Sequence, residues 1–390
     1  RSGSILASLA LVVLAAGASS LHWLTRPHIF TFLLLAVWVN LMEDLRAGKP
    51  KRWGWMAAVM LLWVNLHGAF IAGFVVWGFY LAGWLWERWV DRKDADGSPG
   101  GLKPLLLGGG ASLIVTLANP AGIHLWGTSL GYLRNAYLVG HTAEYLSPDF
   151  HNTSTWPFLL LIMLTILLFG IQSSSRKAEY VALTGAWMVM SLVSARNIPL
   201  FAIVAPPILA AAGAEWLRTL ADTSRLFARL ASLDMRLFAT ETTLKGILWP
   251  VMGVLAAGIL FLAGARLDFQ RQGNRFNPSV FPVAAVTWLE DHPQTGEVFN
   301  YFPWGGYLLY REWPNLNVFI DGQTDFYGEA LTRQYEQVLT LAPGWQDVLG
   351  EYRVGWVILP SNEALAQALA DDPGWTQVYQ DKTAVILRRK

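Results

Sequence analysis

Arg196 interrupts an otherwise apolar stretch that runs from about residue 178 to residue 214 and is long enough to cross a lipid bilayer twice. An ionised side chain at membrane depth is costly unless it is paired, hydrated or used for a function. A guanidinium group presents a planar fork of donors that matches the oxygens of a phosphate. We therefore interpret Arg196 as a binding residue for a phosphate at the membrane surface, where lipid phosphates are the obvious anions.

Further polar residues stand at the ends of other apolar segments, namely Arg26, His28, Asn65, His67 and Glu144. The topology described below places all of them on the same side of the membrane as Arg196. Taken singly, a His tolerates an interface and an Arg can reach the headgroups, so each has a structural interpretation. As a set, they predict a polar site at one membrane interface. Arg26, His28 and His67 would join Arg196 around the phosphate.

The segment 119–155 is predicted to be a long outer loop, and its many aromatic side chains argue against disorder. It carries Glu144 and Asp149 within the sequence Glu-Tyr-Leu-Ser-Pro-Asp-Phe. Two carboxylates near a bilayer can serve as a catalytic base, as metal ligands, or as a helix cap and a turn. Ser-Pro-Asp is ordinary turn chemistry, which favours a structural role for Asp149.

The composition indicates that these residues are positioned by a membrane protein. Hydrophobic residues make up 54% of the 390 residues and charged residues only 15%, with a mean hydropathy of +0.35. The net charge of +1 gives no indication of nucleic-acid binding. The absence of cysteine excludes disulfides and thiolate chemistry. Because the chain enters an apolar segment directly after Arg1, we expect a further portion upstream.

About nine apolar segments are long enough to cross a bilayer. They are residues 4–24, 29–45, 53–66, 68–86, 104–118, 156–171, 178–194, 198–216 and 246–265. Lys and Arg are concentrated in four of the connections, at 46–52, 88–103, 176–177 and 218–245, and the positive-inside rule places these four in the cytoplasm. The other connections, and everything after Arg266, are then predicted to lie outside.

The sequence from 266 to 390 changes in character and predicts a separate domain. Strand-like runs at 297–301, 317–320, 354–359 and 375–388 are separated by helix-like stretches at 305–312, 329–352 and 362–370. Such alternation predicts an α/β domain with a largely parallel sheet. The expected fold is thus a polytopic α-helical membrane domain, 1–265, followed by an extracytoplasmic α/β domain, 266–390.

Two carboxylates of this domain, Asp321 and Asp325, come just after a predicted strand, at the edge where α/β sheets place their ligands. Tyr307 ends a second local signal, Phe-Pro-Trp-Gly-Gly-Tyr. These residues predict a ligand site. Turn and helix-cap carboxylates are an equally good interpretation.

Several motifs, taken together and in order, resemble those of bacterial polytopic glycosyltransferases of the GT-C superfamily, which includes protein mannosyltransferases and lipid A aminoarabinose transferases. They are Thr25-Arg26-Pro27-His28, Trp63-Val64-Asn65-Leu66-His67-Gly68-Ala69-Phe70, Asn119-Pro120, Glu144 to Phe150, Ala195-Arg196-Asn197, Gly305-Gly306-Tyr307 and Asp321-Gly322-Gln323. The resemblance implies transfer of a sugar from a polyprenyl-phosphate carrier on the outer face of the plasma membrane. It also implies a divalent cation, Mg or Mn, or an acidic base.

The family's catalytic acidic residue usually lies in the first outer loop, and no segment here matches that loop, so we expect it upstream of Arg1. Within the chain, Glu144 is the best base or metal ligand and Asp149 the second. Arg196, His67 and Arg26 would stabilise the departing phosphate, and the C-terminal domain would shape the side of the acceptor.

Two other functions stay open. Intramembrane Arg and His can line the path of a transporter or flippase for an anionic lipid-linked substrate, although the chain lacks the internal repeats usual in transporters. A noncatalytic scaffold subunit of a membrane complex is the other alternative. The nature of the acceptor, whether glycan, lipid or protein, is not indicated by the sequence.

Overall fold

The computed structural model describes residues 3–24, 26–89, 101–140, 142–171, 177–262 and 276–390. The chain forms two compact units, Arg1–Leu255 and Ala256–Lys390. The domain boundary expected near residue 265 falls within 263–275, outside the described residues. Thr25, residues 90–100 of the basic connection 88–103 and Arg176 of the basic connection 176–177 also lie outside them.

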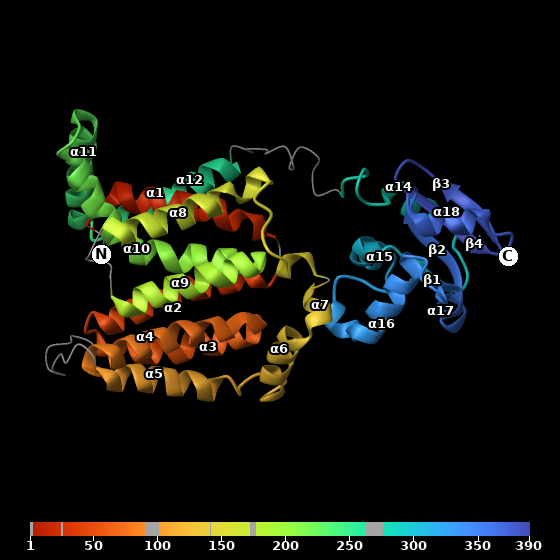
Figure 1. Ribbon diagram of the computed structural model, residues 1–390, viewed down its shortest axis with the longest axis horizontal. Coiled ribbons are helices and arrows are strands. Elements are labelled where there is room, and N and C mark those ends of the chain that lie inside the picture. Colours follow the sequence, from red (N-terminus) through yellow and green to blue (C-terminus); the bar gives the residue numbers. More distant parts are fainter. Residues whose placement is uncertain (1–2, 25, 90–100, 141, 172–176, 263–275) are drawn as a thin grey trace. The chain divides into compact units, whose positions relative to one another are not determined.

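The first unit is helical, and most of its helices run side by side (Figure 1). The helices are α1 (Ile5–Ser19), α2 (His28–Arg46), α3 (Trp53–Leu66), α4 (Ile71–Trp89), α5 (Leu102–Val115), α6 (His124–Arg134), α7 (Ala136–Gly140), α8 (Trp156–Ile171), α9 (Ala178–Val193), α10 (Ile198–Ala221), α11 (Arg225–Thr243) and α12 (Leu248–Leu262), the last of which continues into the second unit.

Within the described residues, five helical segments are long and apolar enough to cross a membrane: Ile5–His22, His28–Arg46, Gly68–Trp89, Thr153–Ile171 and Ala195–Ala221. The length and composition of these segments are those of a membrane protein. The other segments expected to cross are occupied by the shorter apolar helices α3, α5, α9 and α12. The expected number of nine crossings stays a prediction.

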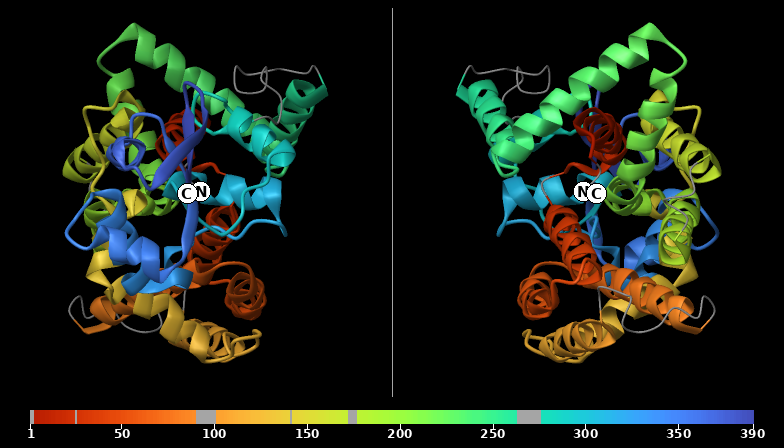
Figure 2. Two further views of the ribbon diagram at one scale, coloured as in Figure 1. Left: turned by 90° about the vertical axis from the view of Figure 1, so that its right-hand side faces the viewer. Right: turned by 90° about the vertical axis from the view of Figure 1, so that its left-hand side faces the viewer.

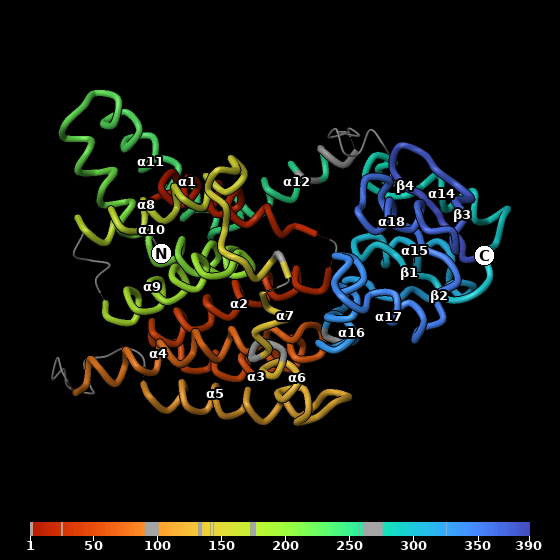
Figure 3. The backbone as a smooth tube through the Cα atoms, turned by 45° about the vertical axis from the view of Figure 1, so that its right-hand side comes forward, coloured from red at the N-terminus to blue at the C-terminus, as the bar shows by residue number. Residues whose placement is uncertain are grey.

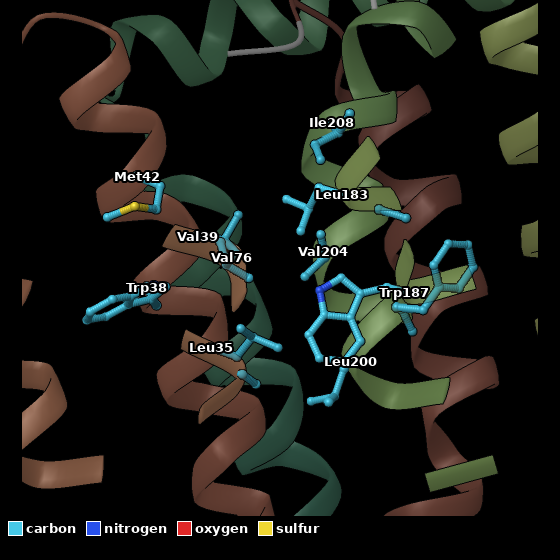
Figure 4. Close-up of a cluster of buried hydrophobic side chains, with 14 of the residues drawn as sticks. Leu35, Trp38, Val39, Met42, Val76, Leu183, Trp187, Leu200, Val204 and Ile208 are labelled. Atoms are coloured by element: carbon cyan, nitrogen blue, oxygen red, sulfur yellow. The ribbon is translucent and has the colours of Figure 1, made fainter. Parts of the chain in front are cut away.

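Helix α10 is the centre of this unit, with 72% of its apolar segment buried inside the protein. It packs against α1, α2, α8 and α9. Figure 4 shows part of the core, in which Leu200 and Val204 of α10 lie among side chains of α2, α4 and α9, including Leu35, Val76 and Trp187. The start of α10, which directly follows Arg196, is therefore buried in the core.

The segment 119–155, predicted to be a loop, is partly helical. It contains α6 and α7, and Trp126 of α6 contacts Phe70 and Phe74 with ring centroids 5.0 and 5.5 Å away. The indole nitrogen of Trp126 also donates to the hydroxyl of Thr116, at 3.0 Å. Aromatic packing on Phe70 and Phe74 thus orders a segment that the predicted topology treated as an outer loop.

The second unit contains α14 (Val283–Asp291), β1 (Glu297–Asn300), α15 (Gly305–Glu312), α16 (Thr324–Leu339), α17 (Trp345–Glu351), β2 (Val354–Pro360), α18 (Ala364–Asp371), β3 (Trp375–Gln380) and β4 (Ala384–Arg389), which can be followed in Figure 3. Its sheet has the order β1-β2-β4-β3. Only β1 and β2 are parallel, while β4 is antiparallel to both of its neighbours. The prediction of a largely parallel sheet is therefore wrong.

Helices cover both faces of this sheet. Val298, Trp356 and Ile358 pack with α14 and α15, whereas the neighbouring strand residues Phe299 and Val357 pack with α16, α17 and α18. This alternation is the two-residue period of a strand buried on both faces. The described part of the unit is thus a three-layer α/β/α arrangement.

The predicted strand at 317–320 does not form, because a side chain takes the place of a strand partner. Asn300, the last residue of β1, is fully buried, and its amide oxygen accepts from the backbone N–H of Phe319 at 2.8 Å. Its amide nitrogen donates to the carbonyl of Ile320 at 2.9 Å. Gly305 must also lie against this segment, since a Cβ there would come within 2.3 Å of the Ile320 carbonyl oxygen.

Replacing Asn300 by alanine is expected to destabilise the second unit by about 3 kcal/mol, because buried backbone groups lose their hydrogen-bond partner. Pulse proteolysis of the full chain in detergent, with cleavage inside 297–390 as the readout, measures the change. Asn317→Ala, an exposed residue of the same segment, is the matched control. Equal stability of the two variants would contradict this role of Asn300.

Candidate functional site

One end of the helical unit brings together the side chains predicted to bind phosphate. Nη1 of Arg26 lies 2.5 Å from Oε1 of Glu144. The rings of His28 and His67 have their centroids 6.4 Å apart. The pKa of His67, in the connection between α3 and α4, is lowered to about 4, first by burial and then by the charges of Arg196 and His28. His67 is therefore neutral at pH 7, and the positive charge of Arg196 contributes to keeping it so.

The connection between α9 and α10 fixes the position of the segment that carries Glu144. The backbone N–H of Ala195 donates to the carbonyl of Leu146 at 2.9 Å. The hydroxyl of Ser194 donates to the carbonyl of Glu144 at 3.4 Å, and that of Ser147 donates to the carbonyl of Val193 at 3.3 Å. Residues 144–147 are thus attached beside Arg196, although they lie about fifty positions away in the sequence.

Arg196 is oriented by Tyr145. Its Nη1 donates to the Tyr145 hydroxyl at 2.6 Å, and its Cζ lies 4.9 Å from the centroid of the Tyr145 ring. Among the described residues, Tyr145 is the sole hydrogen-bond partner of this guanidinium group, so further N–H donors are available to a ligand. From the sequence, Tyr145 was interpreted only as one of the aromatic residues that order the loop; its position directly after Glu144 was the available signal.

The two histidines are oriented by neighbours as well. Nε2 of His28 lies 2.6 Å from the carbonyl oxygen of His22, to which it donates. Nδ1 of His67 lies 2.8 Å from the hydroxyl of Thr31, and that hydroxyl also accepts from the Trp63 indole at 2.8 Å. When Thr31 donates onward to Nδ1, the imidazole proton of His67 resides on Nε2, which becomes a donor.

Thr31 and Trp63 were not identified as site residues from the sequence. Thr31 follows His28 by one turn of helix, on the same side of α2, which was the available signal.

The charges of this cluster favour an anion. Among the described residues of the cluster, two guanidinium groups, of Arg26 and Arg196, accompany one carboxylate, that of Glu144, which is paired with Arg26. The Arg26–Glu144 pair is half-exposed, whereas Arg196 is partly buried. A phosphate would balance the excess positive charge and accept charge-assisted hydrogen bonds.

Asp149 and Asn65 bond to backbone groups. Oδ1 of Asp149 accepts from the backbone N–H of His151 at 2.9 Å, which is turn chemistry. The Asn65 amide donates to the carbonyls of Leu61 and Ala118, both at 2.9 Å, and so joins the ends of α3 and α5. A catalytic role of Asp149 stays a prediction.

The residues predicted as a ligand site in the second unit also make internal contacts. Oδ1 of Asp321 accepts from the backbone N–H of Gln323 at 2.8 Å, and the buried Tyr307 hydroxyl accepts from Arg311 at 3.1 Å. The side chain of Asp325 lies outside the described residues. The proposed ligand role of these three residues stays a prediction.

The side chains of the cluster fit a divalent cation poorly. Arg26 neutralises the Glu144 carboxylate, and the Asp149 carboxylate caps its own turn. Among the described residues, no three His, Asp or Glu side chains are placed to share a metal ion. Among the described residues of the cluster, the carboxylate of Glu144 is engaged by a guanidinium group, which suits a bound anion better than a bound metal ion, and the divalent cation that the resemblance implies stays a prediction.

No known protein family and no curated protein matches the sequence of this chain. The resemblance to the GT-C superfamily therefore rests on the motifs alone. Four of those motifs contribute residues to the cluster: Arg26 and His28, then His67, then Glu144, then Arg196.

Proposed function

We propose that the chain is a membrane glycosyltransferase that moves a sugar from a polyprenyl-phosphate-linked donor to an acceptor hydroxyl at the outer face of the plasma membrane. The observation that carries this proposal is the grouping of Arg26, His28, His67 and Arg196 with one carboxylate, Glu144, at one end of a bundle of apolar helices. N–H groups that can bind phosphate, beside a carboxylate that can act as a base, suit a sugar substrate carried on a lipid phosphate at the bilayer boundary.

In the proposed reaction, the acceptor oxygen forms a bond to the anomeric carbon of the sugar while the bond from that carbon to the phosphate oxygen breaks. The bonding electrons go to the phosphate, whose growing negative charge is met by Arg196 and by the Nε2–H of His67. The proton of the acceptor hydroxyl goes to Glu144. Arg26, paired with Glu144 at 2.5 Å, orients that carboxylate.

The four basic connections support a cytoplasmic location for the opposite end of the bundle. The site and the second unit would then both be extracytoplasmic. A glycan, a lipid or a protein could each serve as the acceptor at the outer face of the membrane.

Glu144→Gln in the full-length protein is expected to lower transfer by roughly 10²–10⁴-fold, the range that general-base help supplies, while the donor still binds. One assay measures transfer of a labelled sugar from a polyprenyl-phosphate donor in nanodiscs. A second assay measures binding of the unlabelled donor to the same variant. Asp222→Asn, an exposed carboxylate at the other end of α10, is the charge-matched control.

Full transfer by Glu144→Gln would remove Glu144 from the mechanism. Movement of the intact donor between the leaflets of a vesicle, without transfer, would indicate a flippase instead of a transferase.

A further inference from the structure

Helix α11 runs across the direction of the other helices of the first unit, at the end opposite to the cluster (Figures 1 and 2). Its depth is fixed by Asp234, whose Oδ1 accepts from the backbone N–H groups of Ile5 and Leu6, both at 2.8 Å. These are the first residues of α1, where the apolar segment Ile5–His22 begins. Because an apolar segment starts at the membrane surface, α11 lies at the level of the lipid headgroups.

The same contact fixes the rotation of α11 about its axis. With about 3.6 residues per turn, Phe227, Leu230 and Leu237 share the face of Asp234, and all three are half-buried. The opposite face carries three exposed arginines, Arg225, Arg229 and Arg236. The helix therefore directs apolar side chains toward the bundle and the bilayer and its arginines away from the bilayer core.

The neighbouring helices cover only part of the apolar face. Leu226, Leu233 and Phe238 flank the half-buried side chains and are 62%, 46% and 37% exposed. A helix of this kind lies in the plane of a membrane, with its apolar side in the boundary between headgroups and acyl chains. Lipid is thus the medium that would cover these three side chains.

The charges select the kind of lipid. Arg225, Arg229 and Arg236 form one exposed basic row at headgroup depth, and basic rows at that depth attract anionic phospholipids. The connection between α2 and α3, which carries Lys49, Lys51 and Arg52, is another of the basic connections predicted to lie on the same side of the membrane as α11.

We propose that α11 is an interfacial anchor that lies in the plane of the membrane and binds the anionic phospholipids of that leaflet. This property is independent of sugar transfer. Through Asp234, the anchor also holds the first turn of α1 at the membrane surface.

The position of the helix is tested with single cysteines, since the chain has none of its own. A fluorophore is attached to Leu233→Cys, on the proposed lipid side, or to Ala239→Cys, on the exposed polar side, in nanodiscs of phosphatidylcholine and phosphatidylglycerol. The label at position 233 is expected to be quenched by brominated lipid and the label at 239 by aqueous iodide. Equal quenching of the two labels by iodide would overturn the proposal.

The lipid preference is tested by titrating the detergent-solubilised Leu233→Cys protein with phosphatidylglycerol or phosphatidylcholine and following the fluorophore. Phosphatidylglycerol is expected to bind more tightly, and Arg225→Gln, Arg229→Gln and Arg236→Gln are each expected to weaken that binding about fivefold. Combined replacement of Arg388, Arg389 and Lys390 by Gln, exposed residues of the second unit, removes three positive charges, more than any of these variants, and should still leave the binding unchanged. No preference for phosphatidylglycerol, or an equal loss in the control, would contradict an anionic-lipid anchor.

Discussion

Arg196→Ala is expected to lower sugar transfer by roughly 10²–10³-fold, the effect of removing one donor that stabilises a developing oxyanion. The guanidinium group is partly buried and directed by the Tyr145 hydroxyl 2.6 Å away, whereas the guanidinium group of Arg26 is engaged by the Glu144 carboxylate. Arg196→Lys keeps the charge but loses the fork, and an intermediate loss is expected. Transfer of labelled sugar in nanodiscs, with the donor concentration varied, measures both variants.

The matched control is Arg88→Ala, which removes an exposed arginine near the end of α4 and should leave transfer unchanged. The helical unit of Arg196→Ala should unfold at the same temperature as that of the parent protein. A variant that folds normally and transfers sugar at the parent rate would exclude Arg196 from the site.

Arg46→Ala is expected to destabilise the helical unit by about 3–5 kcal/mol, because it leaves a buried carboxylate without its counter-charge. Nη2 of Arg46, at the end of α2, lies 2.5 Å from Oε1 of Glu87 and 2.7 Å from Oε1 of Glu179. The Glu179 side chain is fully buried, and its Oε2 has no hydrogen-bond partner among the described residues. It packs directly on Gly83 of α4, where a Cβ would come within 2.4 Å of the Glu179 Cβ.

Thermal unfolding in detergent micelles measures the effect of Arg46→Ala. Arg52→Ala, whose half-exposed side chain lies 3.5 Å from Asp44, is the control, and it should cost less than about 1 kcal/mol. Adding Glu179→Gln to Arg46→Ala should restore part of the loss, since the unpaired charge is then absent. Similar unfolding of Arg46→Ala and Arg52→Ala would refute the role of Arg46 as a buried counter-ion.

The apolar periodicity of the sequence predicted where the helices of the first unit lie, since each expected segment is occupied by a helix. It did not predict the network of Arg46, Glu87 and Glu179. In the sequence, Arg46 and Glu87 stand at the ends of apolar segments, where charged side chains are expected to be exposed to solvent. Their pairing depends on how α2, α4 and α9 pack, which one sequence does not reveal.

In the second unit, the strands at 317–320 and 375–388 were wrongly predicted because side chains form hydrogen bonds with backbone groups that a strand would use for pairing. The run 375–388 was predicted as one strand, but Asp381 accepts from the backbone N–H groups of Thr383 and Ala384, both at 2.7 Å, and so closes a hairpin between β3 and β4. Asn300 likewise prevents a strand at 317–320. Asp and Asn are the residues that most readily divert a strand in this way.

The candidate site was predicted in part. Polar residues at the ends of separate apolar segments indicated a common side of the membrane, and Arg26, His28, His67, Glu144 and Arg196 do lie together. Tyr145, Thr31 and Trp63 were missed because each has an ordinary structural interpretation in its own segment. Their contribution arises from contacts between segments far apart in the chain.

The outer strands of the sheet are β1 and β3, and each has a feature that discourages pairing with a strand of another molecule. β1 is only four residues long, and Asn300 holds the segment before Asp321 next to its end. The pairing of β3 with β4 shifts register between Gln377 and Tyr379, which disturbs the regular row of backbone groups. Short or irregular edges are how natural sheets avoid edge-to-edge aggregation. Loss of Asn300 would therefore expose a template for intermolecular β-pairing as well as weaken the fold.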